Sequence, residues 1–379
     1  MADRETEVVA KIASGLSNLN ATAWDRLARD DPFVSHAFLS ALETSGSVGK
    51  GTGWTPATLL VEDEASRLVS AAPAYLKTHS QGEYVFDHGW ADAFERAGGT
   101  YYPKLQIAVP FTPVPGARLL GTQPQILLAA AEAVVVQNEI SSAHITFIDD
   151  AGASECERRG WLLRDGIQYH WRSRGYRDFE DFLSGLTSRK RKAIRKEREV
   201  AREGLEFRIL RGREIGEADW EWMWRFYQDT GSRKWGRPYL TRRFFDLIGQ
   251  SMGEKLLLFM ALREGEPIGG ALNLIGPDTL YGRYWGTVEE VPFLHFELCY
   301  YQAIEWAIGN GLTNVQAGAQ GEHKLARGYE PVITKSAHFL PDPSFHQAVE
   351  QFLVAERAAI SAEMDWLKRS LPYRMSSSA

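Results

Sequence analysis

The chain has 379 residues, of which 44% are hydrophobic and 24% are charged, and its formal net charge at pH 7 is −6. This length exceeds the usual size of one hydrophobic core, so we expect two domains in an ordinary globular protein. The acidic balance excludes a protein that coats nucleic acid through its overall charge, but it leaves a local basic patch open.

The first half of the chain predicts a mixture of helices and strands. Helices are expected at residues 21–28, 32–44, 124–138 and 153–159, and strands at residues 57–61, 67–76, 84–87 and 144–148. Residues 57–61 and 67–76 flank a polar turn at residues 62–64, which is typical of a strand pair. Four prolines lie in residues 101–120, so an irregular, stiff loop is expected there.

The second half predicts the same order of elements. Helices are expected at residues 220–230, 241–252 and 293–308, and strands at residues 255–263, 267–275, 279–285 and 314–317. A long amphipathic helix is expected at residues 345–371. The order helix, helix, strand meander, helix, strand therefore occurs twice, with little residue identity between the copies.

This repeat predicts an α/β (α+β) fold with two tandem domains like those of acetyltransferases. Each domain would be a mixed, mostly antiparallel sheet flanked by helices. The predicted boundaries are 1–170 for the N-terminal domain, 171–344 for the C-terminal domain with the main site, and 345–379 for a C-terminal helix and tail. In such a domain a splayed strand pair admits an acyl group, and the following helix offers free N–H donors.

A basic segment lies between the two halves. Residues 189–203 contain eight basic and three acidic residues, with Thr187 or Ser188 as a helix cap and Gly204 as a stop signal. One interpretation is a solvated helix with internal Glu–Arg pairs. The other is a clamp for the phosphates of a nucleotide, a diphosphate or tRNA. The candidate phosphate-binding residues are Arg189, Lys190, Arg191, Lys192 and Arg195.

A second group of candidates surrounds the start of the helix expected at residues 293–308. Arg283 and Trp285 lie between glycines at the end of a strand, where a ligand can approach the backbone closely. His295 and Glu297 lie in the first helical turn, where a histidine can act as a base and a glutamate stabilises the positive helix end. The alternative is a partly buried, satisfied histidine and an ordinary first-turn carboxylate.

A third group follows the strand expected at residues 314–317. Its ionisable or aromatic members are Glu322, His323, Lys324, Arg327 and Tyr329. The open end of a sheet is the usual ligand position in α/β folds, and a cation there can hold a phosphate or stabilise an oxyanion. The alternative is an exposed charged loop. Because no HExxH spacing is present among the histidines and glutamates of these groups, we expect no metal site.

Four motifs resemble those of the FemAB-like family of predicted N-acyltransferases, in the GNAT superfamily. They are His295-Phe-Glu-Leu-Cys-Tyr-Tyr, Gly318-Ala-Gln-Gly-Glu-His-Lys-Leu-Ala-Arg-Gly-Tyr, Pro113-Val-Pro-Gly-Ala-Arg-Leu-Leu and Gln168-Tyr-His-Trp. The resemblance extends over roughly residues 18–353. More distantly, the chain is similar to the Fem transferases, which move an aminoacyl group from tRNA onto the peptide stem of peptidoglycan precursors.

The resemblance implies transfer of an acyl or aminoacyl group to a small-molecule or peptide amine. His295 or Glu297 would take the amine proton, and Lys324 would stabilise the developing negative charge. Substrate would be held by the remaining candidates, which are Arg283, Trp285, Glu322, His323, Arg327 and Tyr329. The alternative is a non-catalytic protein that holds a nucleotide-linked or peptide precursor in the same cleft.

The acyl donor stays open between aminoacyl-tRNA and acyl-CoA, and no tightly bound cofactor is expected. Where acetyltransferases carry a glycine-rich CoA loop, this chain has Gly286-Thr-Val-Glu-Glu-Val-Pro, whose glutamates would repel a pyrophosphate. The charged N-terminus does not resemble a secretory signal, and no apolar run has the length of a membrane helix. With Cys156 and Cys299 as reduced thiols, a cytoplasmic location is expected.

Overall fold

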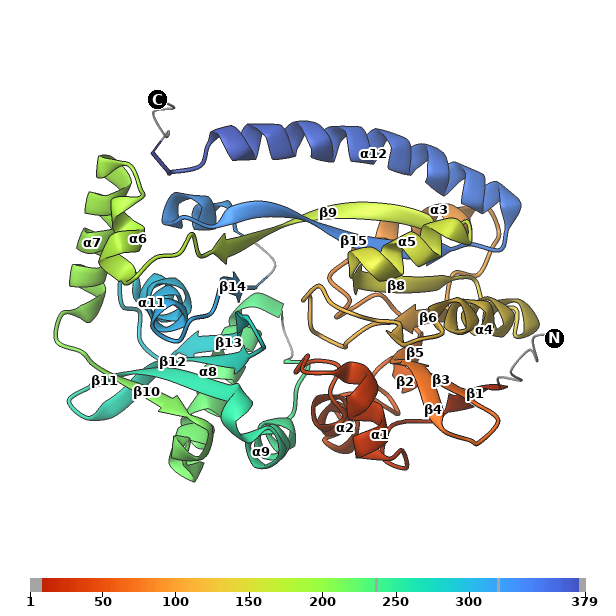
Figure 1. Ribbon diagram of the computed structural model, residues 1–379, viewed down its shortest axis with the longest axis horizontal. Coiled ribbons are helices and arrows are strands. Elements are labelled where there is room, and N and C mark those ends of the chain that lie inside the picture. Colours follow the sequence, from red (N-terminus) through yellow and green to blue (C-terminus); the bar gives the residue numbers. More distant parts are fainter. Residues whose placement is uncertain (1–8, 236–237, 319–320, 375–379) are drawn as a thin grey trace, which may run out of the picture. The chain divides into compact units, whose positions relative to one another are not determined.

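The computed structural model describes residues 9–235, 238–318 and 321–374 (Figure 1). Two compact units divide the chain: unit 1 contains Met1–Gly166 and Ile333–Ser361, and unit 2 contains Ile167–Val332 and Ala362–Ala379. The chain passes between the units within β9 (Leu162–Arg172), β15 (Glu330–Phe339) and α12 (Pro343–Arg369). The predicted boundary at residue 171 lies inside β9, and a division into consecutive segments does not describe the return of the chain to unit 1.

Unit 2 is built on one sheet with the strand order β10-β11-β12-β13-β14-β9. Its strands are β10 (Glu206–Arg211), β11 (Leu256–Arg263), β12 (Glu266–Ile275), β13 (Thr279–Thr287) and β14 (Asn314–Ala317). Its helices are α6 (Phe179–Ser184), α7 (Ser188–Arg202), α8 (Glu217–Trp235), α9 (Arg242–Ser251), α10 (Leu294–Phe296) and α11 (Gln302–Gly309). Neighbouring strands are antiparallel except for the parallel pair β13–β14.

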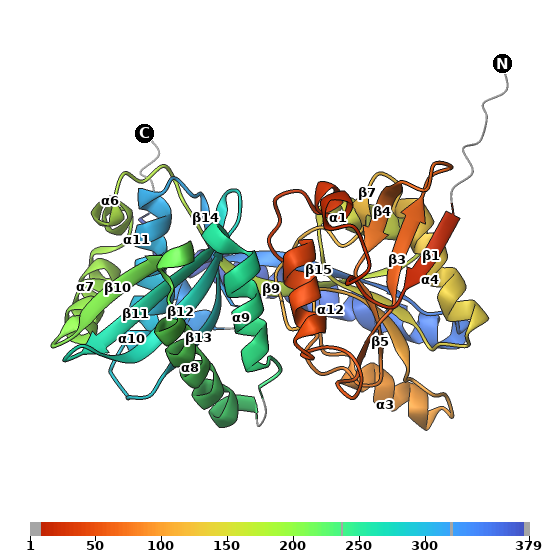
Figure 2. The same cartoon turned by 90° about the horizontal axis from the view of Figure 1, so that it is seen from below.

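Helices cover both faces of this sheet because its strands are apolar on both sides. In β11, Leu257, Phe259 and Ala261 belong to the core that contains α11. The alternate residues Leu258 and Met260 are also fully buried, as expected for a strand covered on both faces. Figure 2 shows α8 along the side of β12 and β13 that lies opposite α11.

The pairing of β13 with β14 stops before β13 ends, and the region beyond the last pair is called the opening here. Residues 279–282 of β13 pair with residues 314–317 of β14. Beyond this point β13 continues to Thr287, whereas β14 ends and the chain turns away at Gly318, whose φ is +76°. This positive φ suits glycine, and within the described residues no strand pairs with residues 283–287 of β13 on that side.

Unit 1 contains two sheets. The strands β1 (Val9–Ala13), β3 (Thr58–Glu62), β4 (Leu68–Ala72) and β7 (Leu120–Gly121) form the order β1-β3-β4-β7. The second sheet has the order β15-β8-β6-β5-β2, with β8 (Ala143–Ile148), β6 (Lys104–Ile107), β5 (Ala74–Lys77) and β2 (Trp54–Pro56). The helices of unit 1 are α1 (Ala21–Ala28), α2 (His36–Thr44), α3 (His88–Arg96), α4 (Pro124–Gln137) and α5 (Asp150–Arg158).

The internal repeat is a parallel crossover in each unit. In unit 1 the helix α4 connects the parallel strands β6 and β8, and in unit 2 the helix α11 lies between the parallel strands β13 and β14. Two helices precede the strand meander in each copy, namely α1 and α2 in unit 1 and α8 and α9 in unit 2. The predicted order of elements is therefore present in both units.

Three local predictions in unit 1 are wrong. Residues 84–87 form no strand but a loop that leads into α3, a helix that was not predicted. The stretch 101–120, expected to be a loop, contains β6 and begins β7. The expected strand at 67–76 is divided at Pro73 into β4 and β5, which belong to different sheets because proline cannot donate a ladder hydrogen bond.

The long helix expected at the end of the chain is α12, which contains 27 residues. In unit 1 its residues Phe345, Val349 and Leu353 form a small core with Trp90 and Tyr101. Among the described residues, no helix combines the length and the apolar character that a membrane crossing requires.

Candidate active site in unit 2

The ammonium group of Lys324 lies at the opening beyond β14. Lys324 belongs to a short 3-10 helix, Glu322–Arg327, and only 1% of the residue is exposed. Its Nζ donates a hydrogen bond to the carbonyl oxygen of Gly318 at 2.6 Å. Burial lowers the pKa of Lys324 to about 7, although the nearby Cys299 thiol raises it. Lys324 can therefore gain or lose its proton near neutral pH.

Aromatic and imidazole rings lie around His295, one of the two predicted bases. The ring centroid of His295 is 5.0 Å from that of Trp285 and 6.4 Å from that of His323. The Nε2 atom of His323 is 2.9 Å from the hydroxyl of Tyr300, whose ring contacts His295 at 5.2 Å. The structure thus brings together Trp285, His295 and His323, which lie on three separate segments of the sequence.

The helix that carries His295 is irregular at this point. Phe293, which precedes α10, has a φ of +63°, and residues Glu297–Tyr301 form one π-helical turn before α11 begins. Such π turns are frequent at functional sites. This turn changes the direction of the side chains after His295 relative to the regular helix expected at residues 293–308.

Strand β9 adds polar residues that were not among the predicted site residues. His170 is 8% exposed, and burial lowers its pKa to about 3, with a further decrease from the charge of Lys324. Its Nε2 lies 3.1 Å from Oε1 of Gln168, and its strand partner is Gln316 of β14. The Oε1 atom of Gln316 is buried without a hydrogen-bond partner among the described residues. The sequence feature that could have indicated Gln168 and His170 is their alternation within the motif Gln168-Tyr-His-Trp, which places both side chains on the same face of a strand.

Glu297 is not placed as a general base. Its side chain is fully buried, and its carboxylate accepts hydrogen bonds from Arg198 at 3.0 Å and from Arg202 at 2.8 Å. Two guanidinium groups compensate its charge, and the carboxylate has no exposed surface for contact with a substrate. The predicted catalytic role of Glu297 finds no support in this geometry, which assigns it to the contact between α7 and the π turn.

The basic helix α7 has two different halves. In its second half, Glu197, Arg198 and Arg202 make ion pairs within unit 2. In its first half, Arg195 pairs with the exposed Glu180. The remaining predicted phosphate-binding residues, Arg189, Lys190, Arg191 and Lys192, make no ion pair within the described ranges and are partly or fully exposed. The ion pairs of Glu197, Arg198 and Arg202 therefore join α7 to other elements of unit 2, and the phosphate clamp stays a prediction for the first half of α7.

Two other predicted substrate-binding residues, Arg327 and Tyr329, are buried in unit 2. Arg327 is 7% exposed and donates hydrogen bonds to Glu197, to the Tyr301 hydroxyl and to the His323 carbonyl. Tyr329 is fully buried, and its ring centroid lies 5.5 Å from that of Tyr300 in the core of unit 2. Of the others, Arg283 is half-buried on β13, and the side chain of Glu322 lies outside the described part of the structure.

The family model for FemAB-like proteins, described as peptidoglycan biosynthesis/recognition, matches residues 15–375. The chain belongs to the FemAB-like family. A search of curated proteins finds no match to this FemAB-like chain.

Solved structures confirm the predicted fold of the FemAB-like chain. FemX shares 11% identity with a TM-score of 0.54, over 91% of this chain and 100% of FemX. A conserved protein of unknown function from Bacteroides thetaiotaomicron VPI-5482 shares 11% identity with a TM-score of 0.52, over 88% of this chain and 100% of that protein. The fold is therefore that of tandem acetyltransferase-like units, as predicted.

Proposed function

We propose that this FemAB-like protein is an N-acyltransferase whose active site is the opening between β13 and β14 in unit 2. The observation that carries the proposal is the buried ammonium of Lys324 at this opening. The ring of His295 lies between those of Trp285 and His323, with centroid distances of 5.0 Å and 6.4 Å. A buried cation, an imidazole and an aromatic wall beside the end of β14 suit the polarisation of an acyl carbonyl.

In the proposed reaction the nitrogen of a primary amine attacks the acyl carbon of an ester or thioester donor. The carbonyl oxygen becomes an oxyanion, which protonated Lys324 stabilises. His295 takes the proton from the attacking nitrogen and gives it to the leaving group as the carbon–oxygen or carbon–sulfur bond breaks. The products are the amide and the free alcohol or thiol, so atoms and protons balance.

The first half of α7 favours an aminoacyl-tRNA as the donor. Arg189, Lys190, Arg191 and Lys192 offer four basic side chains without ion-pair partners in the described chain. Clustered, uncompensated basic residues bind the phosphates of a polynucleotide. By contrast, the loop after β13 carries Glu289 and Glu290, and Glu289 already pairs with Arg263 at 3.0 Å. Carboxylates at this position disfavour the pyrophosphate of CoA.

The description of the family supports a peptide amine of a peptidoglycan precursor as the acceptor. The half-buried Arg283 on β13 would hold an anionic part of that acceptor. Such a guanidinium binds carboxylates and phosphates in a bidentate manner.

The test is an acyl-transfer assay with the purified full-length protein. Aminoacyl-tRNA and acyl-CoA donors are offered with a panel of peptide amines, and products are identified by mass spectrometry. We expect amide product with aminoacyl-tRNA and its loss in Lys324→Met and His295→Ala. Binding of substrates without product in the wild-type protein would instead support a non-catalytic binding protein.

A further inference from the structure

One face of the second sheet in unit 1 is buried and yet polar. The residues on this face are Lys77 of β5, Lys104 and Gln106 of β6, His144 and Thr146 of β8, and Ser336 and His338 of β15, all at most 3% exposed. The opposite face is apolar and packs against α4. Burying a charged group costs free energy unless a partner compensates the charge. This polar face therefore calls for a functional explanation.

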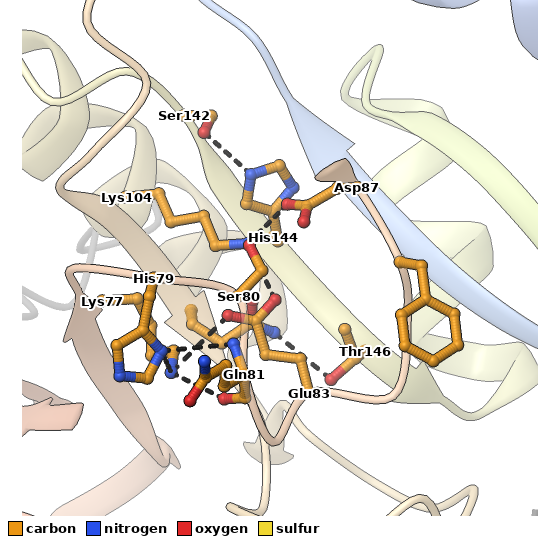
Figure 3. Close-up of polar contacts among 12 residues, drawn as sticks. Lys77, His79, Ser80, Gln81, Glu83, Asp87, Lys104, Ser142, His144 and Thr146 are labelled. Carbon is orange, nitrogen blue, oxygen red and sulfur yellow. Dashed lines mark hydrogen bonds and ion pairs between the residues drawn. The ribbon is translucent and has the colours of Figure 1, made fainter. Parts of the chain in front are cut away.

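The loop between β5 and α3 covers this face and supplies two carboxylates. Lys104 Nζ donates to Glu83 Oε2 at 2.7 Å, to Ser80 Oγ at 2.7 Å and to Asp87 (Figure 3). Glu83 and Asp87 are 4% and 3% exposed. Two carboxylates from one loop therefore share a single lysine of the sheet.

A chain of hydrogen bonds continues from Asp87 across the sheet. The Tyr101 hydroxyl donates to Asp87 Oδ2 at 2.7 Å and lies 3.3 Å from Nε2 of His144. The Nδ1 atoms of His144 and His338 are 2.7 Å apart, so one imidazole donates and the other accepts. Burial lowers the pKa of both histidines, so these rings stay neutral at neutral pH and do not balance the charge of the carboxylates.

Three acceptor atoms in this cluster lack a partner. Glu83 Oε1, Asp87 Oδ1 and Gln106 Oε1 are buried without a hydrogen bond from any described residue. Lys77 Nζ forms an ion pair with Glu83 Oε1 at 3.8 Å, a distance that is too long for a hydrogen bond. All three atoms are acceptors, so the missing partner must be a donor. Orphaned buried groups of this kind are rare and need an explanation.

We propose that unit 1 contains a second ligand site that binds the ammonium group of a small amine between Glu83, Asp87 and Gln106. An ammonium carries three N–H donors, which matches the three orphaned acceptors. Its charge is favoured when Lys77, which lies 3.8 Å from Glu83, is neutral, because Glu83 and Asp87 then share the ammonium of Lys104. This proposal stands on unit 1 alone and does not depend on acyl transfer in unit 2.

A cavity lies beside the proposed site. It has a volume of about 800 Å³ and is lined mainly by apolar side chains, including Phe86, Trp90, Phe94 and Phe345. Phe86 directly precedes Asp87 in the chain, and the Trp90 ring contacts that of His338 at 4.8 Å. The covering loop contains Gly82, whose φ is +81°, and exposed Gln81. Movement of this loop would connect the carboxylates with the cavity or with solvent.

Binding of an ammonium should release a proton near neutral pH. Burial raises the pKa of Glu83 to about 7, although Lys104 lowers it, and burial lowers the pKa of Lys77 to about 7, although Glu83 raises it. The other groups that face this pair are Asp87, Lys104, His79 and, farther along the sheet, His144. A bound cation favours ionised Glu83 and neutral Lys77, so it displaces protons.

The test is isothermal titration calorimetry of the full-length protein with ethanolamine, in buffers of different ionisation enthalpy. We expect binding with net proton release and an affinity that rises about tenfold from pH 6 to pH 8, as Glu83 ionises. Ethylene glycol, which has a hydroxyl in place of the amine, should bind at least tenfold more weakly. No ethanolamine binding, equal binding of ethylene glycol, or pH-independent binding without proton release would each overturn the proposal.

Two variants locate the site. Glu83→Gln keeps the size of the side chain but removes its charge, so we expect ethanolamine affinity to fall at least tenfold and proton release to disappear. Glu95→Gln on α3 removes an exposed carboxylate of the same unit and should leave both unchanged. Retained binding in Glu83→Gln, or equal loss in both variants, would contradict the proposed location. If Glu83→Gln does not fold, the pH dependence of the wild-type titration decides.

Discussion

Arg198 donates two hydrogen bonds of 3.0 Å to the carboxylate of Glu297 and so joins α7 to the π turn behind His295. The guanidinium also lies 4.4 Å from the ring centroid of Phe179, which belongs to the core of unit 2. Arg198 therefore contributes to packing as well as to charge balance. Through this contact the second half of α7 holds the helical segment that carries the proposed base.

Glu297→Ala should destabilise unit 2 by about 3 kcal/mol, because it leaves the guanidinium of Arg198 without its buried counter-charge. The matched control is Glu305→Ala: Glu305 pairs with the same arginines but its side chain is 49% exposed, so we expect a loss of about 1 kcal/mol at most. Urea denaturation of both variants measures the difference. Equal stability of the two variants would show that the buried pair is not the stronger contact.

Tyr329→Phe should leave acyl transfer unchanged and should not lower stability. The hydroxyl of Tyr329 is buried without a hydrogen-bond partner among the described residues, so its removal eliminates an unsatisfied group worth about 1 kcal/mol or more. Thermal unfolding and the transfer assay provide the measurements. A marked loss of activity in a stably folded Tyr329→Phe protein would mean that substrate reaches this hydroxyl.

The double variant Arg189→Ala/Lys192→Ala should weaken binding of tRNA. Both residues are exposed at the start of α7, and each lost phosphate contact lowers the slope of log K against log salt by about 0.7–0.9. Titration of tRNA at several salt concentrations measures this slope. A charge-matched control is Lys50→Ala/Arg96→Ala, two exposed basic residues of unit 1, for which no change is expected. The same loss in both double variants would argue against a localised phosphate site.

The stability of unit 1 should fall as the pH rises from about 4.5 to 7. Burial raises the pKa of Glu83 from 4.5 to about 7, so the folded state binds more protons than the unfolded state over this range. Glu83→Gln should therefore flatten the decline by up to about 3 kcal/mol. Urea titrations at pH 5 and pH 7 measure it, with Glu95→Gln as the control. An unchanged pH dependence in Glu83→Gln would show that another group causes the decline.

The order of elements could be predicted from the sequence because hydrophobic periodicity and turn residues mark most helices and strands. Strand β6 was missed for a physical reason. Its short sequence, Lys-Leu-Gln-Ile, alternates two polar residues that are buried here with two apolar ones, and prolines lie nearby at positions 103 and 110. These polar residues are buried because they belong to the charge cluster of unit 1. Their partners come from other parts of the sequence and are recognised only in the folded chain.

The site in unit 2 could be predicted in part. The sequence placed His295, His323 and Lys324 near the end of one sheet, where the structure also places them. It could not show that Glu297 and Arg327 form ion pairs with residues of α7, because these partners are separated from them by about 100 residues or more in the sequence. Long-range ion pairs leave no local pattern, so buried structural charges and reactive charges look alike in the sequence.

The central claim, that protonated Lys324 stabilises the oxyanion, is tested most directly by the pH dependence of kcat/KM in wild type and Lys324→Arg. Because burial lowers the pKa of Lys324 to about 7, wild-type acyl transfer should fall as the pH rises through about 7. Arginine keeps its charge at all accessible pH values, so in Lys324→Arg the alkaline decline should disappear below pH 9, even if the maximal rate is lower. An alkaline limb at the same pH in both proteins would contradict the role assigned to Lys324.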